Sequence, residues 1–162
     1  PIDGILESVE WSVLLFFAAL FIAVGGLEAS GILEALGESV AGLAKENLLL
    51  AGILVLWVGA IASAIIDNIP FTIALVPVIQ QLGELGINVS PLWWALAFGA
   101  GFGGNGTPIG STANVVTITV SERTEYPITT KIWLRSGLIA MLVTTTVSSI
   151  MFVVLFELFK TP

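Results

Sequence analysis

The sequence predicts an all-α integral membrane protein, in which spanning helices are combined with a re-entrant helix hairpin and a broken (discontinuous) helix. Three observations predict this class. Hydrophobic residues make up 56% of the 162 residues and charged residues only 10%, whereas a soluble domain carries about 25% charged residues. Residues 11–27, 47–66 and 136–156 contain no ionisable side chain, and a helix needs about 17–25 such residues to cross a bilayer. Two polar, helix-breaking motifs interrupt the apolar sequence, at 67–70 and 103–114.

The composition also limits which side chains can bind metals or carry protons. The chain has no cysteine and no histidine, so disulfides and sites built from thiolates or imidazoles are excluded, and proton-coupled chemistry falls to carboxylates. Because the sequence shows no nucleophile–base pair and no cluster of metal ligands, we expect neither an enzyme nor a cofactor beyond a coupling ion, and no nucleic acid partner. The chain starts at Pro1 and leads directly toward an apolar segment, so we expect a fragment of a longer polypeptide.

Residues 1–46 are predicted to hold a first span and a surface helix, as part of a scaffold. The span runs from Trp11 to about Ser30. In residues 32–45, apolar side chains recur every three or four positions, with charged residues between them. This spacing is typical of an amphipathic helix that is too charged to cross the membrane and lies along its surface.

Residues 47–122 are predicted to form the transport part, which begins with the hairpin. The apolar segment 47–66 is followed by Asp67-Asn68-Ile69-Pro70 and by a second arm, Phe71 to about Leu82. This arm is roughly 18 Å long at 1.5 Å per residue, too short to cross a bilayer, and Pro70 interrupts a regular helix. A re-entrant hairpin with a polar tip explains these features, provided that protein or a wet cavity satisfies the tip. The alternative is that Asp67 is an interfacial loop acid between two ordinary spans.

The broken helix follows the hairpin. Six glycines and one proline lie between Gly99 and Asn114, and such a segment cannot hold one straight helix. We expect two half-helices, about Leu92–Phe102 and Ser111–Val120, joined by an unwound loop. The alternative is a glycine-lined helix whose small residues allow tight packing.

Residues 123–162 are predicted to complete a polar loop and to form the final span, Ile132–Phe159. The Thr144–Ser149 cluster inside this span is expected to hydrogen-bond back to helix carbonyls. The whole pattern describes a multi-pass protein in contact with the lipid bilayer, and we expect it in the plasma (inner) membrane.

Two broken elements in one short chain predict an ion or substrate site. Transporters use the backbone groups that a broken helix frees: half-helix N-termini attract anions, and free carbonyls coordinate cations. Side-chain oxygens from both motifs would complete a cage suited to a hard cation, a proton or an oxyanion. The polar residues that the two motifs supply are Asp67, Asn68, Asn105, Thr107, Ser111, Thr112 and Asn114.

These motifs resemble signatures of the ion-transporter superfamily. The branch that they resemble holds bacterial arsenite permeases, D-type sodium/proton antiporters and the P protein. The segments concerned are Ser63–Thr72 (SAIIDNIPFT) and Gly103–Val116 (GGNGTPIGSTANVV), and the opening Val9–Phe17 and Gly25–Glu28 are similar to the same branch.

The resemblance implies a transporter of two inverted repeats, of which this chain is the C-terminal one. It also implies a homodimer in which the hairpin-bearing part moves like an elevator against the scaffold, and an N-terminal repeat of the same transporter as partner. By the same resemblance, the hairpin tip corresponds to the region of Asp67, Asn68 and Thr72, and the second signature maps onto Asn105, Gly106, Thr107 and Asn114. Ser63, in the first signature, is a further candidate ligand.

The expected function is therefore transport of a small inorganic ion or anion by alternating access, as Na⁺/H⁺ exchange or as arsenite-type efflux. Asp67 is the expected coupling group, with a Na⁺ site at Asp67, Asn68 and Asn105. If the cargo is an anion, the half-helix N-termini near Phe71 and Ser111 would hold it. The alternatives are di- or tricarboxylate transport on the same fold, a channel-like anion conductance, and a membrane scaffold that does not transport.

Overall fold

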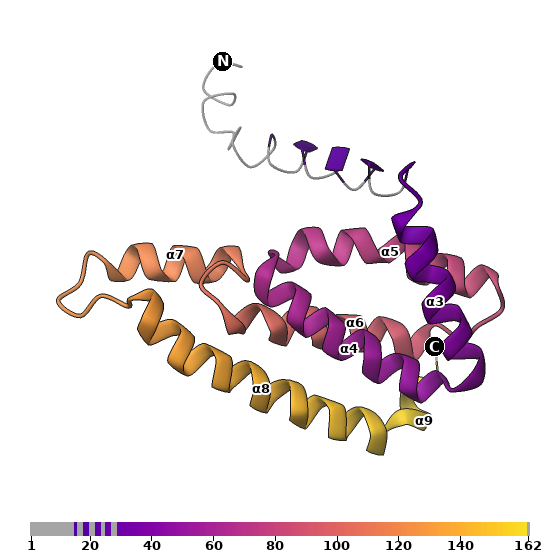
Figure 1. The fold of residues 1–162 in the computed structure, drawn as a ribbon. Coiled ribbons are helices and arrows are strands. Elements are labelled where there is room, and N and C mark those ends of the chain that lie inside the picture. Colours follow the sequence, from indigo (N-terminus) through magenta and orange to yellow (C-terminus); the bar gives the residue numbers. More distant parts are fainter. Residues whose placement is uncertain (1–14, 16–17, 20–21, 24, 27–28, 162) are drawn as a thin grey trace, which may run out of the picture.

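The computed structural model describes residues 15, 18–19, 22–23, 25–26 and 29–161, and Figure 1 shows how their helices are arranged. All regular secondary structure in this part of the chain is helical, which confirms the all-α prediction. The predicted span at 11–30 lies largely outside the described residues and stays a prediction. The elements are α3 (Ile32–Glu46), α4 (Leu48–Ile65), α5 (Asn68–Glu84), α6 (Ser90–Gly103), η1 (Gly104–Gly106), α7 (Thr112–Ser121), α8 (Thr130–Val154) and α9 (Phe156–Phe159).

Among the described helices, α4 and α8 are long and apolar enough to cross a membrane. Asn47 starts α4, because its Oδ1 accepts the backbone N–H of Leu50 at 3.0 Å. The 18 residues of α4 extend about 27 Å at 1.5 Å per residue. One face of α4 is buried and the other is apolar but exposed, as on a helix that faces lipid or another apolar partner. The exposed residues recur at helical spacing: Leu50, Leu54, Val58, Ile61 and Ile65.

The buried face of α4 packs on α6, and the two helices run side by side in the same direction. A side chain at Gly99 would collide with the backbone of Leu56, and one at Gly103 with the backbone of Ala60. Small residues therefore let the two backbones approach closely, as is common between membrane helices. The C-terminal ends of α4 and α6 consequently lie at the same level (Figure 1).

The second arm of the hairpin is longer than the sequence predicts. Helix α5 begins at Asn68 and ends at Glu84, so the predicted start at Phe71 and end at Leu82 are wrong. Its 17 residues extend about 25 Å. Pro70 fits inside the first turn, where its missing N–H would have no helical partner in any case. The chain thus breaks before Pro70, at Ile66 and Asp67, and the re-entrant depth of the hairpin stays a prediction.

The broken helix is present, with slightly different limits. Helix α6 starts at Ser90 and continues to Gly103, one short 3₁₀ turn follows, and α7 starts at Thr112. The expected limits Leu92–Phe102 and Ser111–Val120 are displaced because Pro91 is accommodated at the start of α6 and Ser111 caps α7 from outside it. Glycine-mediated packing is present as well, at Gly99 and Gly103. The two explanations of the glycine run therefore apply to different glycines.

Helix α3 packs against the hairpin. Its Ala41 and Ala44 are buried with Ile79 and Leu82 of α5 in one hydrophobic cluster. The predicted helix Ile32–Lys45 is thus formed, ending at Glu46. Its position along a membrane surface stays a prediction.

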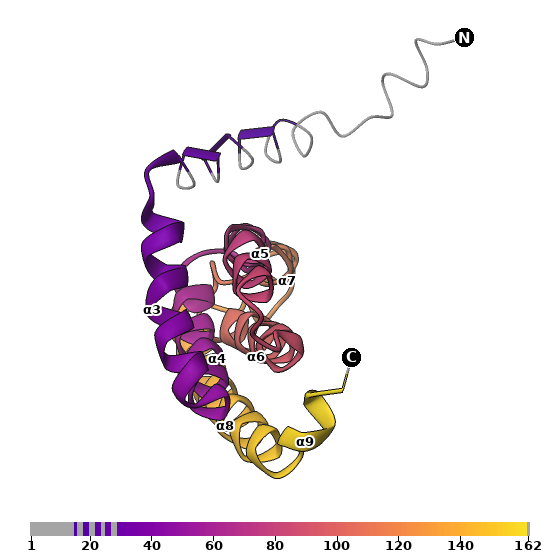
Figure 2. The ribbon, with the colours of Figure 1, turned by 90° about the vertical axis from the view of Figure 1, so that its right-hand side faces the viewer.

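The final predicted span, Ile132–Phe159, is not one helix. Helix α8 ends at Val154, and α9 turns back toward α6 after Leu155 (Figure 2). The turn brings Phe159 against Trp94 and Phe98 of α6, at ring-centroid distances of 5.5 and 5.9 Å. This aromatic contact explains why the apolar segment bends where the sequence shows no helix breaker.

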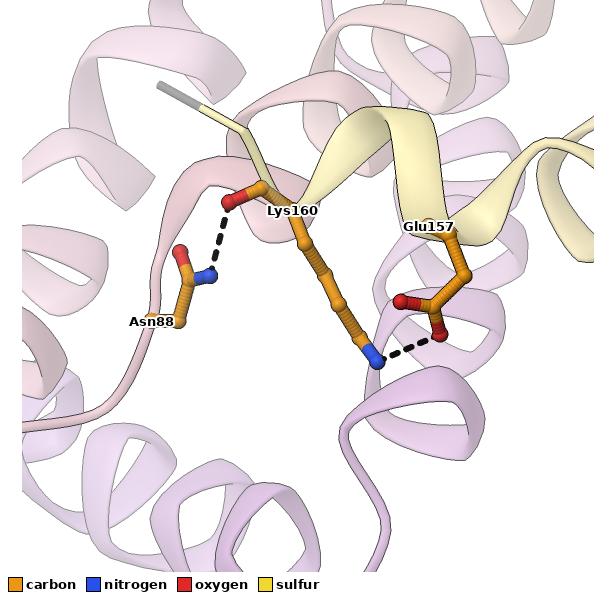
Figure 3. Close-up of polar contacts among 3 residues, drawn as sticks. All are labelled: Asn88, Glu157 and Lys160. Atoms are coloured by element: carbon orange, nitrogen blue, oxygen red, sulfur yellow. Dashed lines mark hydrogen bonds and ion pairs between the residues drawn. The ribbon is translucent and has the colours of Figure 1, made fainter.

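Polar contacts fasten the same end of the chain. The side-chain amide of Asn88 donates to the carbonyl of Lys160 at 2.9 Å, and Lys160 pairs with Glu157 at 2.6 Å (Figure 3). The α5–α6 loop is thereby tied to the end of the chain, at the opposite end of α6 from the break.

Candidate functional site

Four helix ends meet near the middle of the described structure. Helices α4 and α6 end there, while α5 and α7 begin there and lie roughly end to end (Figure 1). When the molecule is turned by 90°, α5 and α7 overlap, which agrees with this arrangement (Figure 2). Because a helix N-terminus carries a partial positive charge and a C-terminus a partial negative charge, both signs are concentrated at this junction.

Asp67 lies at the junction and joins the two broken elements. Its Oδ1 accepts the backbone N–H of Ile69 at 3.0 Å and caps α5. Its Oδ2 accepts the hydroxyl of Thr112, at the start of α7, at 2.6 Å. One half-buried carboxylate thus contacts both helix N-termini, where a negative charge is stabilised. The two sequence motifs, 45 residues apart along the chain, form a single site.

Two hydroxyls hold the broken helix against α4. Ser63 is fully buried and donates to the carbonyl of Ala100 at 2.7 Å, and Thr107 donates to the carbonyl of Ala64. Both acceptors belong to the last turn of a helix, and the carbonyl of Ala100 also accepts the backbone N–H of Gly104 at the end of α6. Ser63 and Thr107 therefore join the end of α4 to α6 and to the turn that follows α6.

Asn114 and Ser111 shape the turn between η1 and α7. The buried amide of Asn114 donates to the carbonyls of Gly104 and Thr107, at 2.7 and 3.0 Å. Since an amide NH₂ has two hydrogens, its donor capacity is fully used. Ser111 caps α7, with its Oγ accepting the N–H of Ala113 at 3.3 Å. Both side chains have a structural task at this position.

Helix α8 fixes the other side of the same turn. The indole N–H of Trp133 donates to the carbonyl of Asn105 at 3.1 Å. Gly106 is buried so closely that a Cβ there would lie 2.5 Å from the sulfur of Met141. The backbone of Asn105 is thus engaged by α8, and no hydrogen bond in the described part of the chain joins Asn105 to Asp67.

Asn68 and Thr72 remain open. They lie one turn apart on α5 and line a shallow depression of about 250 Å³, together with Ile69 and Ile73. Within the described residues, neither side chain makes a hydrogen bond. Their amide and hydroxyl are therefore available to a ligand next to the Asp67 carboxylate.

The structure sorts the predicted site residues into two groups. Asp67, Asn68 and Thr72 gather at the first turn of α5. The others build or support the turn of the broken helix: Ser63, Asn105, Gly106, Thr107, Ser111 and Asn114. Trp133 is a supporting residue that sequence reasoning missed. Nothing in the sequence reveals it, because its acceptor is a backbone carbonyl 28 positions away.

Apolar helices with two broken elements that meet at a carboxylate are an arrangement that membrane transporters use. The comparison with known sequences identifies the family: the sequence model of the citrate transporter family matches residues 1–99. The chain belongs to this family. The match includes the hairpin motif and ends before the second motif.

Individual relatives agree with this assignment. The chain is 45% identical to the human P protein over 151 residues, which are 88% of this chain and 18% of that protein. It is 40% identical to an uncharacterized transporter of Mycobacterium tuberculosis over 149 residues, 90% of this chain and 34% of that protein. An uncharacterized transporter of Synechocystis is 32% identical over 166 residues, 92% of this chain and 37% of that protein.

These relatives confirm the resemblance to the ion-transporter superfamily and to the branch that holds the P protein. The chain spans less than two fifths of the length of these relatives. No solved structure matches it.

Proposed function

We propose that the chain is the C-terminal half of a secondary active transporter that moves a small inorganic ion or anion by alternating access, and that Asp67 binds the coupling ion, Na⁺ or H⁺. The observation that carries this proposal is the position of Asp67 between the two broken elements, in contact with the first turns of both α5 and α7. A change at this carboxylate acts on both elements at once. That property is what a coupling site requires.

The charge of the junction supports a cation at Asp67. Within the described residues the salt bridge lies at the far end of α6, between Glu157 and Lys160, so Asp67 has no basic partner there. A carboxylate without a basic partner attracts a cation, and Na⁺ and H⁺ compete for the same oxygen atoms. The open amide of Asn68 is adjacent in sequence and supplies a neutral oxygen, the kind of ligand that hard cations take.

A second candidate is transport of a di- or tricarboxylate, which the description of the matching family as citrate transporters favours. In that case the helix N-termini of α5 and α7 would attract the carboxylate groups. The depression beside Asn68 and Thr72 offers neutral hydrogen-bonding groups at one of these termini. Asp67 would then hold the coupling cation, so both candidates assign it the same role.

The remaining features follow from the same proposal. The protein would be a non-enzymatic, multi-pass transporter of the plasma (inner) membrane, paired with an N-terminal repeat of the same polypeptide and assembled as a homodimer. The apolar exposed face of α4 supports such pairing, because it offers lipid or a second repeat a continuous hydrophobic surface.

The test uses the complete transporter in proteoliposomes under imposed Na⁺ and pH gradients. We expect Asp67→Asn to abolish Na⁺- or H⁺-coupled flux, whereas Glu84→Gln, which removes an exposed carboxylate from the last turn of the same helix, keeps it. Coupled flux that survives in Asp67→Asn would contradict the proposal.

The cargo is determined in the same vesicles. Arsenite efflux driven by the gradients would support the inorganic anion, and citrate uptake would support the carboxylate candidate. Flux that only runs downhill, with no accumulation against a gradient, would show a channel and overturn active transport.

A further inference from the structure

We propose that Thr112 is a positioning residue for the coupling site: it orients the Asp67 carboxylate and so determines how tightly the coupling ion binds. This inference rests on the proposed function of Asp67 and assigns a task to the one side chain that reaches it from the second broken element. The bond joins Thr112 Oγ1 to Asp67 Oδ2 at 2.6 Å.

The three threonines of α7 show that this bond is particular to Thr112. The hydroxyls of Thr117 and Thr119 donate to carbonyls of their own helix, those of Ala113 and Val115, at 2.8 and 2.9 Å. Such back-bonding is the ordinary behaviour of threonine in an apolar helix. Thr112 lies in the first turn, where no carbonyl of α7 precedes it by four residues, and its hydroxyl reaches the other element.

The Asp67 carboxylate can bind an ion while its two hydrogen bonds stay in place. An ionised carboxylate has about four lone-pair positions on its two oxygens. One is used on Oδ1 by the N–H of Ile69 and one on Oδ2 by Thr112. Two donors from different elements fix the plane of the carboxylate, yet an acceptor position remains on each oxygen. Binding an ion therefore does not require Thr112 to leave, and losing Thr112 frees the carboxylate to rotate.

The experiment compares Thr112→Val, Thr112→Ser and Thr117→Val in the complete transporter, with Na⁺ as the probe ion and with pH held constant. Thr112→Val should raise the Na⁺ concentration for half-maximal transport about tenfold, the order expected when a hydrogen bond to a charged group is lost. The maximal rate should stay close to wild type. Thr112→Ser should restore the wild-type value, because it keeps the hydroxyl, and Thr117→Val should not change it.

The possible results are distinguishable from each other. If Thr112→Val lowers the thermal stability or the maximal rate but leaves the half-maximal Na⁺ concentration unchanged, the residue is only structural and the inference is overturned. If Asp67→Asn abolishes coupling while Thr112→Val has no effect on ion affinity, the proposed function stands and this inference fails. If Asp67→Asn leaves coupling intact, the proposed function itself fails.

Discussion

The two breaks in the helices, at 66–67 and at 104–111, are built differently. The first is a two-residue turn between α4 and α5, and it leaves Asn68 and Thr72 without hydrogen bonds in the described part of the chain. The second is a longer turn between α6 and α7, and Asn114 and Trp133 donate to three of its carbonyls, those of Gly104, Asn105 and Thr107. The first break therefore leaves candidate ligands open, whereas the second has its carbonyls bound by side chains that support the turn.

This difference has a physical cause. A long unwound segment frees many backbone groups, and each costs several kcal/mol if it is left unsatisfied at membrane depth. In this protein the buried amide of Asn114 and the indole of Trp133 satisfy carbonyls of the turn. A two-residue break frees few groups, and a single carboxylate with one partner on the other element is sufficient.

The largest effect on stability is expected at Gly103, where α6 packs closely against α4. A methyl group at Gly103 would overlap the carbonyl of Ala60, whereas one at Gly101 meets no atom within 4 Å. Gly101→Ala should be neutral or stabilising by up to about 1 kcal/mol through helix propensity, and Gly103→Ala should destabilise by about 3 kcal/mol through overpacking. Thermal unfolding of the complete transporter in detergent measures both. Equal stability of the two variants would contradict the close α4–α6 contact.

The second prediction tests whether Asn114 supports the turn of the broken helix or binds the ion or substrate. Asn114→Ala removes the two hydrogen bonds to the carbonyls of Gly104 and Thr107, of which that of Thr107 keeps a second donor in the N–H of Gly110, so we expect a loss of about 2 kcal/mol. Thr119→Val is the control, because it removes a bond within the exposed surface of α7. A variant that is as stable as wild type but has weakened ion or substrate affinity would show that Asn114 is a ligand. The second break would then contribute to binding as well as to support.

A smaller loss of stability is expected when Trp133 is changed. Trp133→Phe keeps an aromatic ring against the turn but loses the hydrogen bond to Asn105, at a cost of about 1 kcal/mol. Trp94→Phe is the control: Trp94 is 47% exposed, its ring packs at a tilt against Phe98, and its N–H has no partner among the described residues. Equal melting temperatures for the two variants would show that α8 does not hold the turn.

The sequence predicts both breaks because glycine, proline and polar residues are conspicuous in apolar segments. It predicts that the two breaks share a site, but not the contacts that join them: Asp67 accepts from Thr112, and Ser63 donates to the carbonyl of Ala100. These contacts depend on the parallel packing of α4 and α6, which periodicity does not encode. The start of α5 is misplaced for a similar reason, because Pro70 suggests a break at its own position while Asp67 caps the helix three residues earlier.

The smallest effect on stability is expected at Thr72, together with an effect on transport. Its hydroxyl makes no hydrogen bond within the described residues, and valine has nearly the same shape, so Thr72→Val should change the free energy of unfolding by no more than about 0.5 kcal/mol. If the depression beside Asn68 holds cargo, the substrate concentration for half-maximal transport should nevertheless rise, because a hydrogen-bonding group of the depression is lost. Flux in proteoliposomes and thermal unfolding are measured on the same preparation, with Thr119→Val as the control. Unchanged transport would assign this face of α5 to packing and leave Asp67 as the functional group of the first break.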